Sequence, residues 1–260
     1  MFSYVDLKIR EQLRSGDKLI YLNQDGEQVS EDHDGTPVIS LLGPIPMPVA
    51  VNGQELQLNW FPFVRRVELR HVLEAGKQVQ QGSKEALRLL LQESMSVNSI
   101  LTTADFAQQP SPLVRIHSCC MTGDVFGSMR CECGPQLTLA FEQIAKSGGA
   151  IVYMSSHEGR GIGLWAKAIT YLLQDEGQDT YQANVSLGLP EDSRDFSDAA
   201  IVLKYMLKGK PIQLMSNNPI KFRQLEEAGQ PILKGVRHVI GIGRYNERYM
   251  NSKKEKGHKI

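Results

Sequence analysis

The amino-acid sequence predicts an α/β fold, and three observations point to it. From residue 113 onward, short apolar runs alternate with longer amphipathic segments, as strands alternate with helices in layered domains. Glycine, proline and capping residues stand at the ends of these segments, where turns and helix termini need them. The chain has 260 residues, of which 41% are hydrophobic, so it can bury the core of one large domain or of a domain with an appendage.

The first part of the chain is a polar opening in which we expect a helix and a strand. Tyr4–Leu13 has helical spacing, and Lys18–Leu22 alternates as a strand does before the turn signal at Asn23–Gly26. Glu31–Gly35 has the composition of a loop. His33 lies there among acidic neighbours, which could form a weak metal site, but a solvated turn is the favoured interpretation.

A β-hairpin is the strongest local prediction in the next part of the chain. Asn52-Gly53 lies between two apolar runs, which is the usual hairpin signal. Arg65–Gly76 has no clear pattern. Ser83–Glu93 is predicted to be an amphipathic helix capped by Ser83, and Val97–Thr103 is predicted to be a strand.

The remaining chain is predicted to alternate between strands and helices. Gly177 ends one helix, Asp195 is a capping candidate for the next, and Pro219 stands near the start of the last. Between Gly177 and Glu191 we expect a loop, and the charged tail Lys253–Lys259 is expected to be mobile. The expected strands are Leu113–Ile116, Ala150–Met154, Pro211–Met215 and one from Ile232; the expected helices are Leu137–Lys146, Leu164–Glu176, Asp195–Leu207 and Pro219–Ala228.

The charge and composition of the chain limit the kinds of ligand and partner that we expect it to bind. Lys and Arg total 29, as do Asp and Glu, so any polyanion must be met by local basic groups rather than by a global field. A small ligand is therefore expected, and nucleic acid is not. No apolar run approaches the roughly 18 residues that a membrane helix needs, and the first residues do not have the charged-then-apolar pattern expected of a leader. We expect no membrane partner and a cytoplasmic location.

All four cysteines lie between His117 and Gln136. Cys120, Cys131 and Cys133 could together hold a soft metal such as zinc, and three protein ligands leave a position for water, as in catalytic zinc sites. Cys119 is not expected to join them, because neighbouring side chains point apart in an extended chain. A disulfide and inert core thiols are the alternatives, although a reducing compartment favours metal ligands or reactive thiols over disulfides.

Several polar turns are predicted where strands end and helices begin. Ser155–Gly163 is rich in glycine, and its Arg160 could meet a phosphate or a carboxylate. Lys167, Tyr171 and Asp175 share one helix face, although a solvated stripe would look the same. Further turns are Asp192-Ser193-Arg194-Asp195, which could equally be a capping cluster, and Ser216-Asn217-Asn218-Pro219 with Lys221. Together they indicate a site for a phosphorylated ligand.

Five ordered motifs resemble the GTP cyclohydrolase II family of riboflavin synthesis. They are Arg115–Asp124, Arg130–Gly134, His157–Leu164, Asp192–Phe196 and Asn217–Pro219. The resemblance covers roughly Pro44 to Gly257. It implies a mixed sheet with flanking helices, a catalytic domain over residues 44–260 with a helical insert at about 70–108, and an N-terminal extension over residues 1–43.

The resemblance also implies roles for individual residues. Cys120, Cys131 and Cys133 would hold one Zn²⁺, Tyr171 would shuttle a proton to the base, and Arg194, helped by Asp192, would act at the α-phosphorus as nucleophile or as charge stabiliser. Glu158 could accept hydrogen bonds from guanine, and Mg²⁺ would accompany the triphosphate. The implied nucleotide-binding residues are Arg115, Ile116, His117, Ser118, Cys119, Gln136, Glu158, Gly159, Arg160, Thr180, Ser216 and Lys221.

The sequence departs from the family pattern at a few positions. Cys119 stands where the family usually has glutamate, and Ser156-His157 replaces the usual Arg-Gln, so one phosphate-directed cation is lost. Ser216 replaces threonine and keeps the hydroxyl. These changes fall on groups that hold the base and the phosphates, which is the pattern expected if the substrate has drifted while the ring-opening chemistry is kept.

We therefore expect a zinc-dependent hydrolase of the GTP cyclohydrolase II type, and the resemblance suggests that it is a homodimer. It would open the imidazole ring of GTP and release formate and pyrophosphate to give 2,5-diamino-6-(5-phosphoribosylamino)pyrimidin-4(3H)-one. One alternative is a paralogue that applies the same chemistry to another nucleotide or to a pyrimidine-pathway substrate. A second is a noncatalytic, zinc-stabilised nucleotide-binding protein.

Overall fold

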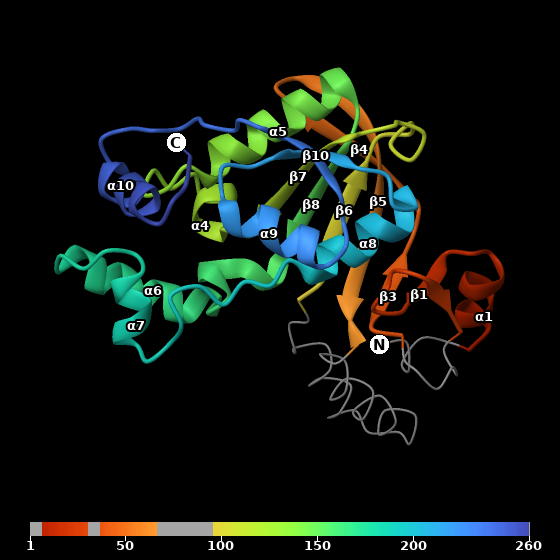
Figure 1. Cartoon of the computed structure of the whole chain (residues 1–260), viewed down its shortest axis with the longest axis horizontal. Coiled ribbons are helices and arrows are strands. Elements are labelled where there is room, and N and C mark those ends of the chain that lie inside the picture. Colours follow the sequence, from red (N-terminus) through yellow and green to blue (C-terminus); the bar gives the residue numbers. More distant parts are fainter. Residues whose placement is uncertain (1–6, 31–36, 67–95, 260) are drawn as a thin grey trace.

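The computed structural model describes residues 7–30, 37–66 and 96–259, and these residues form one ten-stranded mixed sheet (Figure 1). The strand order is β10-β9-β7-β8-β6-β5-β3-β1-β2, with β4 paired to β5 off this path. The strands are β1 (Leu19–Leu22), β2 (Gln28–Val29), β3 (Ile39–Leu42), β4 (Ile45–Val51), β5 (Gln54–Arg65), β6 (Asn98–Thr102), β7 (Leu113–Ser118), β8 (Ala150–Met154), β9 (Ile212–Met215) and β10 (Ile232–Val236).

The sheet has a parallel half and an antiparallel half. Strands β10, β9, β7 and β8 run parallel, whereas β6, β5, β3, β1 and β2 pair antiparallel. The predicted hairpin is confirmed: β4 pairs with β5 and turns at Asn52-Gly53, where both residues have positive φ, as a two-residue hairpin turn requires. Because β3 pairs with β5, the N-terminal strands continue the same sheet.

The helices are distributed over both faces of the sheet. They are α1 (Leu7–Ser15), α4 (Met121–Asp124), α5 (Cys133–Ser147), α6 (Gly163–Asp175), α7 (Gln182–Ser186), α8 (Ser197–Leu207), α9 (Pro219–Glu227) and α10 (Glu247–Glu255), with the 3₁₀ segment η2 at Ser155–Arg160. Helices α8 and α9 pack on the face that carries Val114 and Ile116, while α5 packs on the opposite face against Ile151 and Met215. Among the described residues, no helix is long and apolar enough to cross a bilayer.

This arrangement creates a topological switch point beside β7. The chain leaves β7 through α5 to β8 on one side, and later returns through α8 to β9 on the other side. In open α/β sheets, ligands bind outside the carboxyl ends of strands at such a point. The residues that follow β7, β8 and β9 are therefore brought together at one edge.

Most predicted elements are confirmed, and several predictions are wrong. The segment after Gly177 contains α7 rather than only a loop, and α5 begins at Cys133 rather than at Leu137. The tail Lys253–Lys259 is not a free mobile segment, because α10 reaches Glu255, Lys253 pairs with Glu132, and the Lys259 backbone N–H donates to the Asn217 carbonyl. The predicted loop with His33 and the predicted helix Ser83–Glu93 lie outside the described residues, so the helical insert and the domain boundaries stay predictions.

Candidate active site

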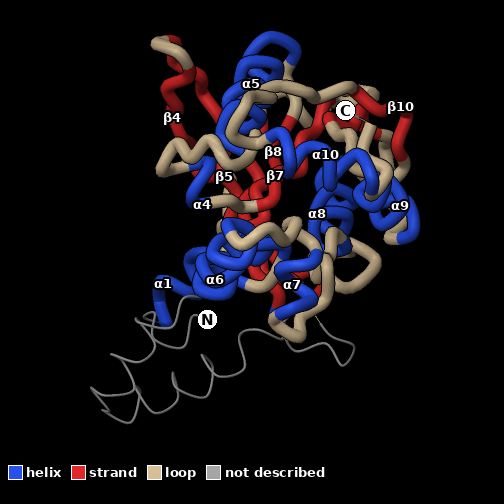
Figure 2. Tube along the Cα trace, turned by 90° about the vertical axis from the view of Figure 1, so that its left-hand side faces the viewer, coloured by secondary structure: helices blue, strands red, loops and turns tan. Residues whose placement is uncertain are grey.

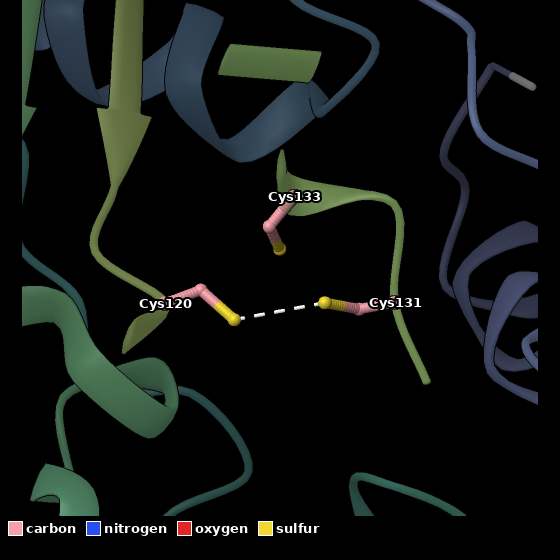
Figure 3. A group of neighbouring side chains, drawn as sticks. All are labelled: Cys120, Cys131 and Cys133. Carbon is pink, nitrogen blue, oxygen red and sulfur yellow. Dashed lines mark hydrogen bonds between the residues drawn. The ribbon is translucent and has the colours of Figure 1, made fainter. Parts of the chain in front are cut away.

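The three predicted metal ligands converge beyond the carboxyl end of β7 (Figure 3). Cys120 precedes α4, Cys131 lies in the following turn, and Cys133 begins α5. The Cys120 and Cys131 sulfurs are 3.6 Å apart, and all three sulfurs lie within 4.8 Å of one another. Tetrahedral zinc with Zn–S bonds of about 2.3 Å would place its sulfurs about 3.8 Å apart. The cluster therefore fits a zinc ion.

Gly123 leaves room for this cluster. A Cβ atom at this position would lie 2.9 Å from the Cys131 sulfur, closer than real Cβ contacts come, and 3.2 Å from the Cys120 sulfur, which is also tight. A Cβ atom at Gly134 would lie only 2.4 Å from the carbonyl oxygen of Gly123. Glycine at both positions thus allows α4 and α5 to bring the three sulfurs together.

Asp124 fixes the start of this loop. Its carboxylate accepts hydrogen bonds from the Cys120 backbone N–H and the Tyr153 hydroxyl, each at 3.0 Å, and from His117 Nε2 at 3.1 Å. Burial lowers the pKa of His117, so the ring is neutral and donates through Nε2. His117 was predicted to bind nucleotide, and its Nδ1 is buried with no partner among the described residues.

Cys119 stays outside the metal cluster, as predicted. All four cysteines are free, and Cys119 Sγ donates to Glu158 Oε2 at 3.7 Å. Burial raises the pKa of Cys119 to about 11, so it is a neutral thiol at physiological pH. In contrast, hydrogen bonds from Cys131 and Cys133 and the charge of Lys167 lower the pKa of Cys120, as suits a metal-binding thiolate.

Lys167 links the metal cluster to Glu158. Its Nζ donates to Glu158 Oε1 at 2.7 Å and to the Cys120 sulfur at 3.2 Å. Burial opposes its charge, but the Cys120 thiolate and Glu158 raise the pKa of Lys167, so it stays protonated. Glu158 also accepts the Met121 backbone N–H at 2.6 Å. The polar stripe predicted on this helix is therefore part of the site at Lys167 and not solvated there.

Tyr171 lies in the same cavity as the three ligand cysteines. Its hydroxyl is 3.0 Å from Thr122 Oγ1, and the Arg130 guanidinium stacks 4.2 Å from its ring centroid. Burial raises the pKa of Tyr171, so the phenol keeps its proton at neutral pH. A protonated tyrosine facing a metal-type site can serve as a proton donor.

Arg194 and Asp192 form a close pair. Arg194 Nε and Nη2 donate to the two carboxylate oxygens of Asp192 at 2.8 and 2.5 Å, and Nη1 donates to Ser118 Oγ at 3.4 Å. Burial disfavours the charged guanidinium, but the hydrogen bond and charge of Asp192 raise the pKa of Arg194. Arg194 is therefore firmly charged, which suits contact with a phosphate better than nucleophilic attack.

A second cavity adjoins the first and is rich in cations. The two cavities share Ser118, Cys133, Arg160, Arg194 and Tyr249. The second cavity is also lined by the predicted residues Arg115, His117, Gln136, Ser216 and Lys221. Cys119, Glu158, Gly159 and Thr180 line the first cavity, whereas Ile116 is a core residue whose carbonyl accepts Lys221 Nζ at 2.7 Å. Asp192 lines neither cavity and contacts the site through its hydrogen bonds with Arg194.

Ser156 and His157 stand where the family usually has Arg-Gln, and neither supplies a positive charge in place of that arginine. His157 Nε2 donates to the Asp195 carbonyl at 2.9 Å, and burial, with the charge of Arg194, lowers the pKa of His157 to about 3. It is therefore neutral. Ser156 turns away toward Asn98 of β6, whose Oδ1 accepts its hydroxyl at 3.4 Å.

Sequence reasoning missed several residues that line the second cavity. Tyr249 and Lys253 come from α10, His258 follows it, and Glu132 lies between two ligand cysteines. Tyr249 and Lys253 are four residues apart on one helix face, a signal that the sequence offered. The charged composition of Lys253–Lys259 instead led to the prediction of a mobile tail.

The fold and the site define a class of protein. A three-thiol cluster at the carboxyl edge of a parallel sheet, opening toward a cation-rich cavity, could hold a metal ion beside an anionic small molecule in an α/β protein. The family model of GTP cyclohydrolase II matches residues 80–237, and the chain belongs to this family.

Several curated relatives are similar to this chain. GTP cyclohydrolase-2 of Psychromonas ingrahamii is 49% identical over 151 residues, which are 58% of this chain and 74% of the relative. Monofunctional riboflavin biosynthesis protein RIBA 3, chloroplastic, of Arabidopsis thaliana is 51% identical over 148 residues, 56% of this chain and 29% of the relative. Riboflavin biosynthesis protein RibBA of Staphylococcus saprophyticus is 49% identical over 148 residues, and the chain covers 37% of its length.

Proposed function

We propose that this chain is a zinc-dependent hydrolase that opens the imidazole ring of GTP and releases formate and pyrophosphate. The product would be 2,5-diamino-6-(5-phosphoribosylamino)pyrimidin-4(3H)-one. One observation carries the proposal: the cysteine cluster and Tyr171 face a cavity that continues, past Ser118 and Arg194, into a cation-rich one. A nucleoside triphosphate needs both environments, with its base at the metal and its phosphates among the cations. Membership of the GTP cyclohydrolase II family supports this choice of substrate.

The chemistry at the base divides between the metal and Tyr171. Zinc held by three thiolates supplies Lewis-acid activation of water, whose pKa it lowers toward about 7. Addition of water at C8 opens the ring when the bond to the neighbouring nitrogen breaks, and that nitrogen needs a proton. Tyr171 keeps its phenolic proton and can supply it. A further water hydrolyses the resulting formamide to formate.

At the phosphates, we assign Arg194 a charge-stabilising role. The bidentate contact with Asp192 holds the guanidinium planar, charged and directed toward Ser118 at the junction of the two cavities. Water attack at the α-phosphorus would break its bond to the α,β-bridging oxygen and release pyrophosphate, and Arg194 would stabilise the negative charge that develops. We propose that Mg²⁺ accompanies the triphosphate and that the other predicted binding residues hold the nucleotide.

If Glu158 binds guanine, one of its present hydrogen-bond donors must leave. A carboxylate offers about four acceptor positions, and those of Glu158 receive Lys167, Met121, Gly159 and Cys119. The Cys119 thiol is the weakest donor of the four, at 3.7 Å. A guanine N–H would therefore displace Cys119. Because the acceptor positions of Glu158 are filled, a second candidate function is also favoured: the same ring-opening chemistry on a nucleotide with a different base.

We further propose a cytoplasmic homodimer. Large apolar side chains are exposed on the turn after α4 and on α6, and contiguous exposed apolar surface often marks an interface between subunits. These side chains are Val125, Phe126, Met129, Trp165 and Leu172. The Arg130 contacts with Tyr171 and Asp175 keep the two segments adjacent.

The direct test is incubation of the zinc-loaded protein with GTP and magnesium, following formate, pyrophosphate and product mass together. Equal amounts of formate and pyrophosphate, with the diaminopyrimidinone product, are expected. Pyrophosphate without formate would rule out ring opening of GTP. In that case, other purine nucleoside triphosphates tested in the same assay would release formate if the second candidate is right. Arg194→Ala is expected to lose pyrophosphate release.

A further inference from the structure

The segment that follows β10 reaches back over the candidate active site. Helix α10 lies at the same end of the molecule as α4, α6 and α7 (Figures 1 and 2). Its Tyr249 and Lys253, together with His258, line the cation-rich cavity. This segment lies beyond residue 237, where the match to the family model ends.

Specific contacts fix the segment in this position. Lys253 Nζ forms an ion pair with Glu132, a fully buried residue between the ligands Cys131 and Cys133. The Lys259 backbone N–H donates to the Asn217 carbonyl at 3.0 Å, in the turn after β9. Arg248 donates to the Gly177 carbonyl at 2.8 Å, after α6. The segment is thus anchored at three separate places, two of them beside residues that line the site.

The cavity that it helps to form carries a strong positive charge. Arg115, Arg160, Arg194, Lys221 and Lys253 line it, and Glu132 is the one acidic residue among its described lining residues. Burial and the neighbouring cations Arg115, Arg194 and Lys253 lower the pKa of Lys221 well below its usual value. Such crowding of cations is relieved when an anion of several charges enters.

Arg115 and Asn218, which line the cavity, also carry buried polar atoms without partners in the described part of the chain. Arg115 Nε and Asn218 Nδ2 are donors with no hydrogen-bond partner among the described residues, although both side chains are buried. Buried donors normally have partners, and each unpaired one costs about 1–3 kcal/mol. A ligand rich in acceptor oxygens would satisfy them.

We propose that Lys253 and His258 of the C-terminal segment bind the terminal phosphates of the nucleoside triphosphate. This inference rests on the proposed function for its substrate. Lys253, His258 and Lys221 line only the cation-rich cavity, whereas Arg194 and Arg160 stand at its junction with the metal cavity. With the base at the cysteines and the α-phosphate at Arg194, the far end of the triphosphate reaches the C-terminal segment.

The test uses the zinc-loaded full chain and two probes, inorganic tripolyphosphate and GMP, in isothermal titration calorimetry. Lys253→Met is expected to weaken tripolyphosphate binding by about tenfold to a hundredfold, because a charge-assisted hydrogen bond is lost. GMP has no terminal phosphates, so its affinity is expected to change by less than about twofold. Lys254→Met, at an exposed neighbour on the same helix, is the matched control and should change neither affinity. His258→Asn should weaken tripolyphosphate selectively.

A second variant covers the case in which Lys253→Met leaves Glu132 unpaired and unfolds the segment. Glu132→Gln together with Lys253→Met removes both charges and is expected to show the same selective loss. Equal tripolyphosphate affinity in wild type, Lys253→Met and Lys254→Met would overturn the inference, as would a wild type that does not bind tripolyphosphate. Selective loss in a protein that releases no formate from GTP would refute the proposed function while upholding the phosphate site.

Discussion

At the scale of single residues, the candidate metal site depends on the missing side chain of Gly123 as well as on the three cysteines. Gly123 lies in α4 directly beside two ligand sulfurs, and its missing side chain leaves the space in which they meet. Its backbone is helical, so an alanine there would be strained only by lack of space.

Gly123→Ala is therefore expected to weaken zinc binding by about tenfold to a hundredfold, the range typical of changes that displace metal ligands. Competition with a chromophoric chelator would measure it. Gly243→Ala is the matched control, because a Cβ there meets no described atom within 4 Å and φ is not positive. Equal zinc affinity in the two variants would refute the steric account.

Tyr171→Phe removes the proton that the proposed mechanism delivers to the base while keeping the ring that packs against Arg130. Formate release is expected to fall by about 10²–10⁴-fold, the usual contribution of a general acid, and pyrophosphate release should continue. Rapid-quench measurement of both products would show this. Thr122→Val removes the partner of the Tyr171 hydroxyl together with a 3.6 Å hydroxyl contact to the Cys120 sulfur, and it should cost much less. Equal loss of both products in Tyr171→Phe would instead assign Tyr171 to binding.

At the scale of elements, Asp124 ties α4 to the parallel strands. Its three donors come from β7, from β8 and from the backbone of the first metal ligand. Asp124→Asn would place an amide donor among these donors, and each unpaired buried group costs about 1–3 kcal/mol. We expect a fall of that size in the free energy of unfolding, measured by urea denaturation, and weaker zinc binding. Asp175→Asn, at an exposed ion pair, should be nearly neutral.

Elements with a strong local pattern could be predicted from the sequence. Strands β7, β8 and β9 are buried, mostly apolar runs, and α9 begins at Pro219, capped by Asn218. Helix α8 begins at Ser197, and its N-cap is Phe196 rather than the predicted Asp195. The position of α10 against the site could not be predicted in this way, because Lys253 is paired with Glu132, 121 residues away, and no local pattern contains that contact. The same holds for η2, where Glu158 and Gly159 leave helical geometry to reach the site.

At the scale of the whole molecule, the site is an assembly of distant segments. The sequence singled out the three cysteines that the fold brings together and most of the basic residues that line the cavities, because their types and spacing carry the chemistry. It could not show that Lys167 contacts Cys120, nor that the four acceptor positions of Glu158 are filled. Those facts depend on packing between α6, η2 and the loop after β7.

The buried histidines make the stability of the whole fold depend on pH. Burial, with the charge of Arg115, lowers the pKa of His238 to about 3, whereas an unfolded histidine titrates near about 6.5. The unfolded chain therefore binds a proton that the folded chain refuses, and stability present above pH 6.5 is lost as the pH falls toward 3.

In the metal-free protein, His238→Gln should make the fall in unfolding free energy between pH 6 and pH 5 shallower by about 1 kcal/mol per pH unit. Urea denaturation at a series of pH values would measure the slope. An unchanged slope would mean that His238 is protonated in the folded state.

The central claim is that the three-cysteine site performs the base-opening step, and one measurement tests it most directly. Zinc content, formate and pyrophosphate would be determined together for the wild type and for Cys131→Ser during incubation with GTP and magnesium. The account predicts one zinc per chain and equal formate and pyrophosphate in the wild type, and neither zinc nor formate in the variant. Retained zinc with full formate release in Cys131→Ser would contradict it.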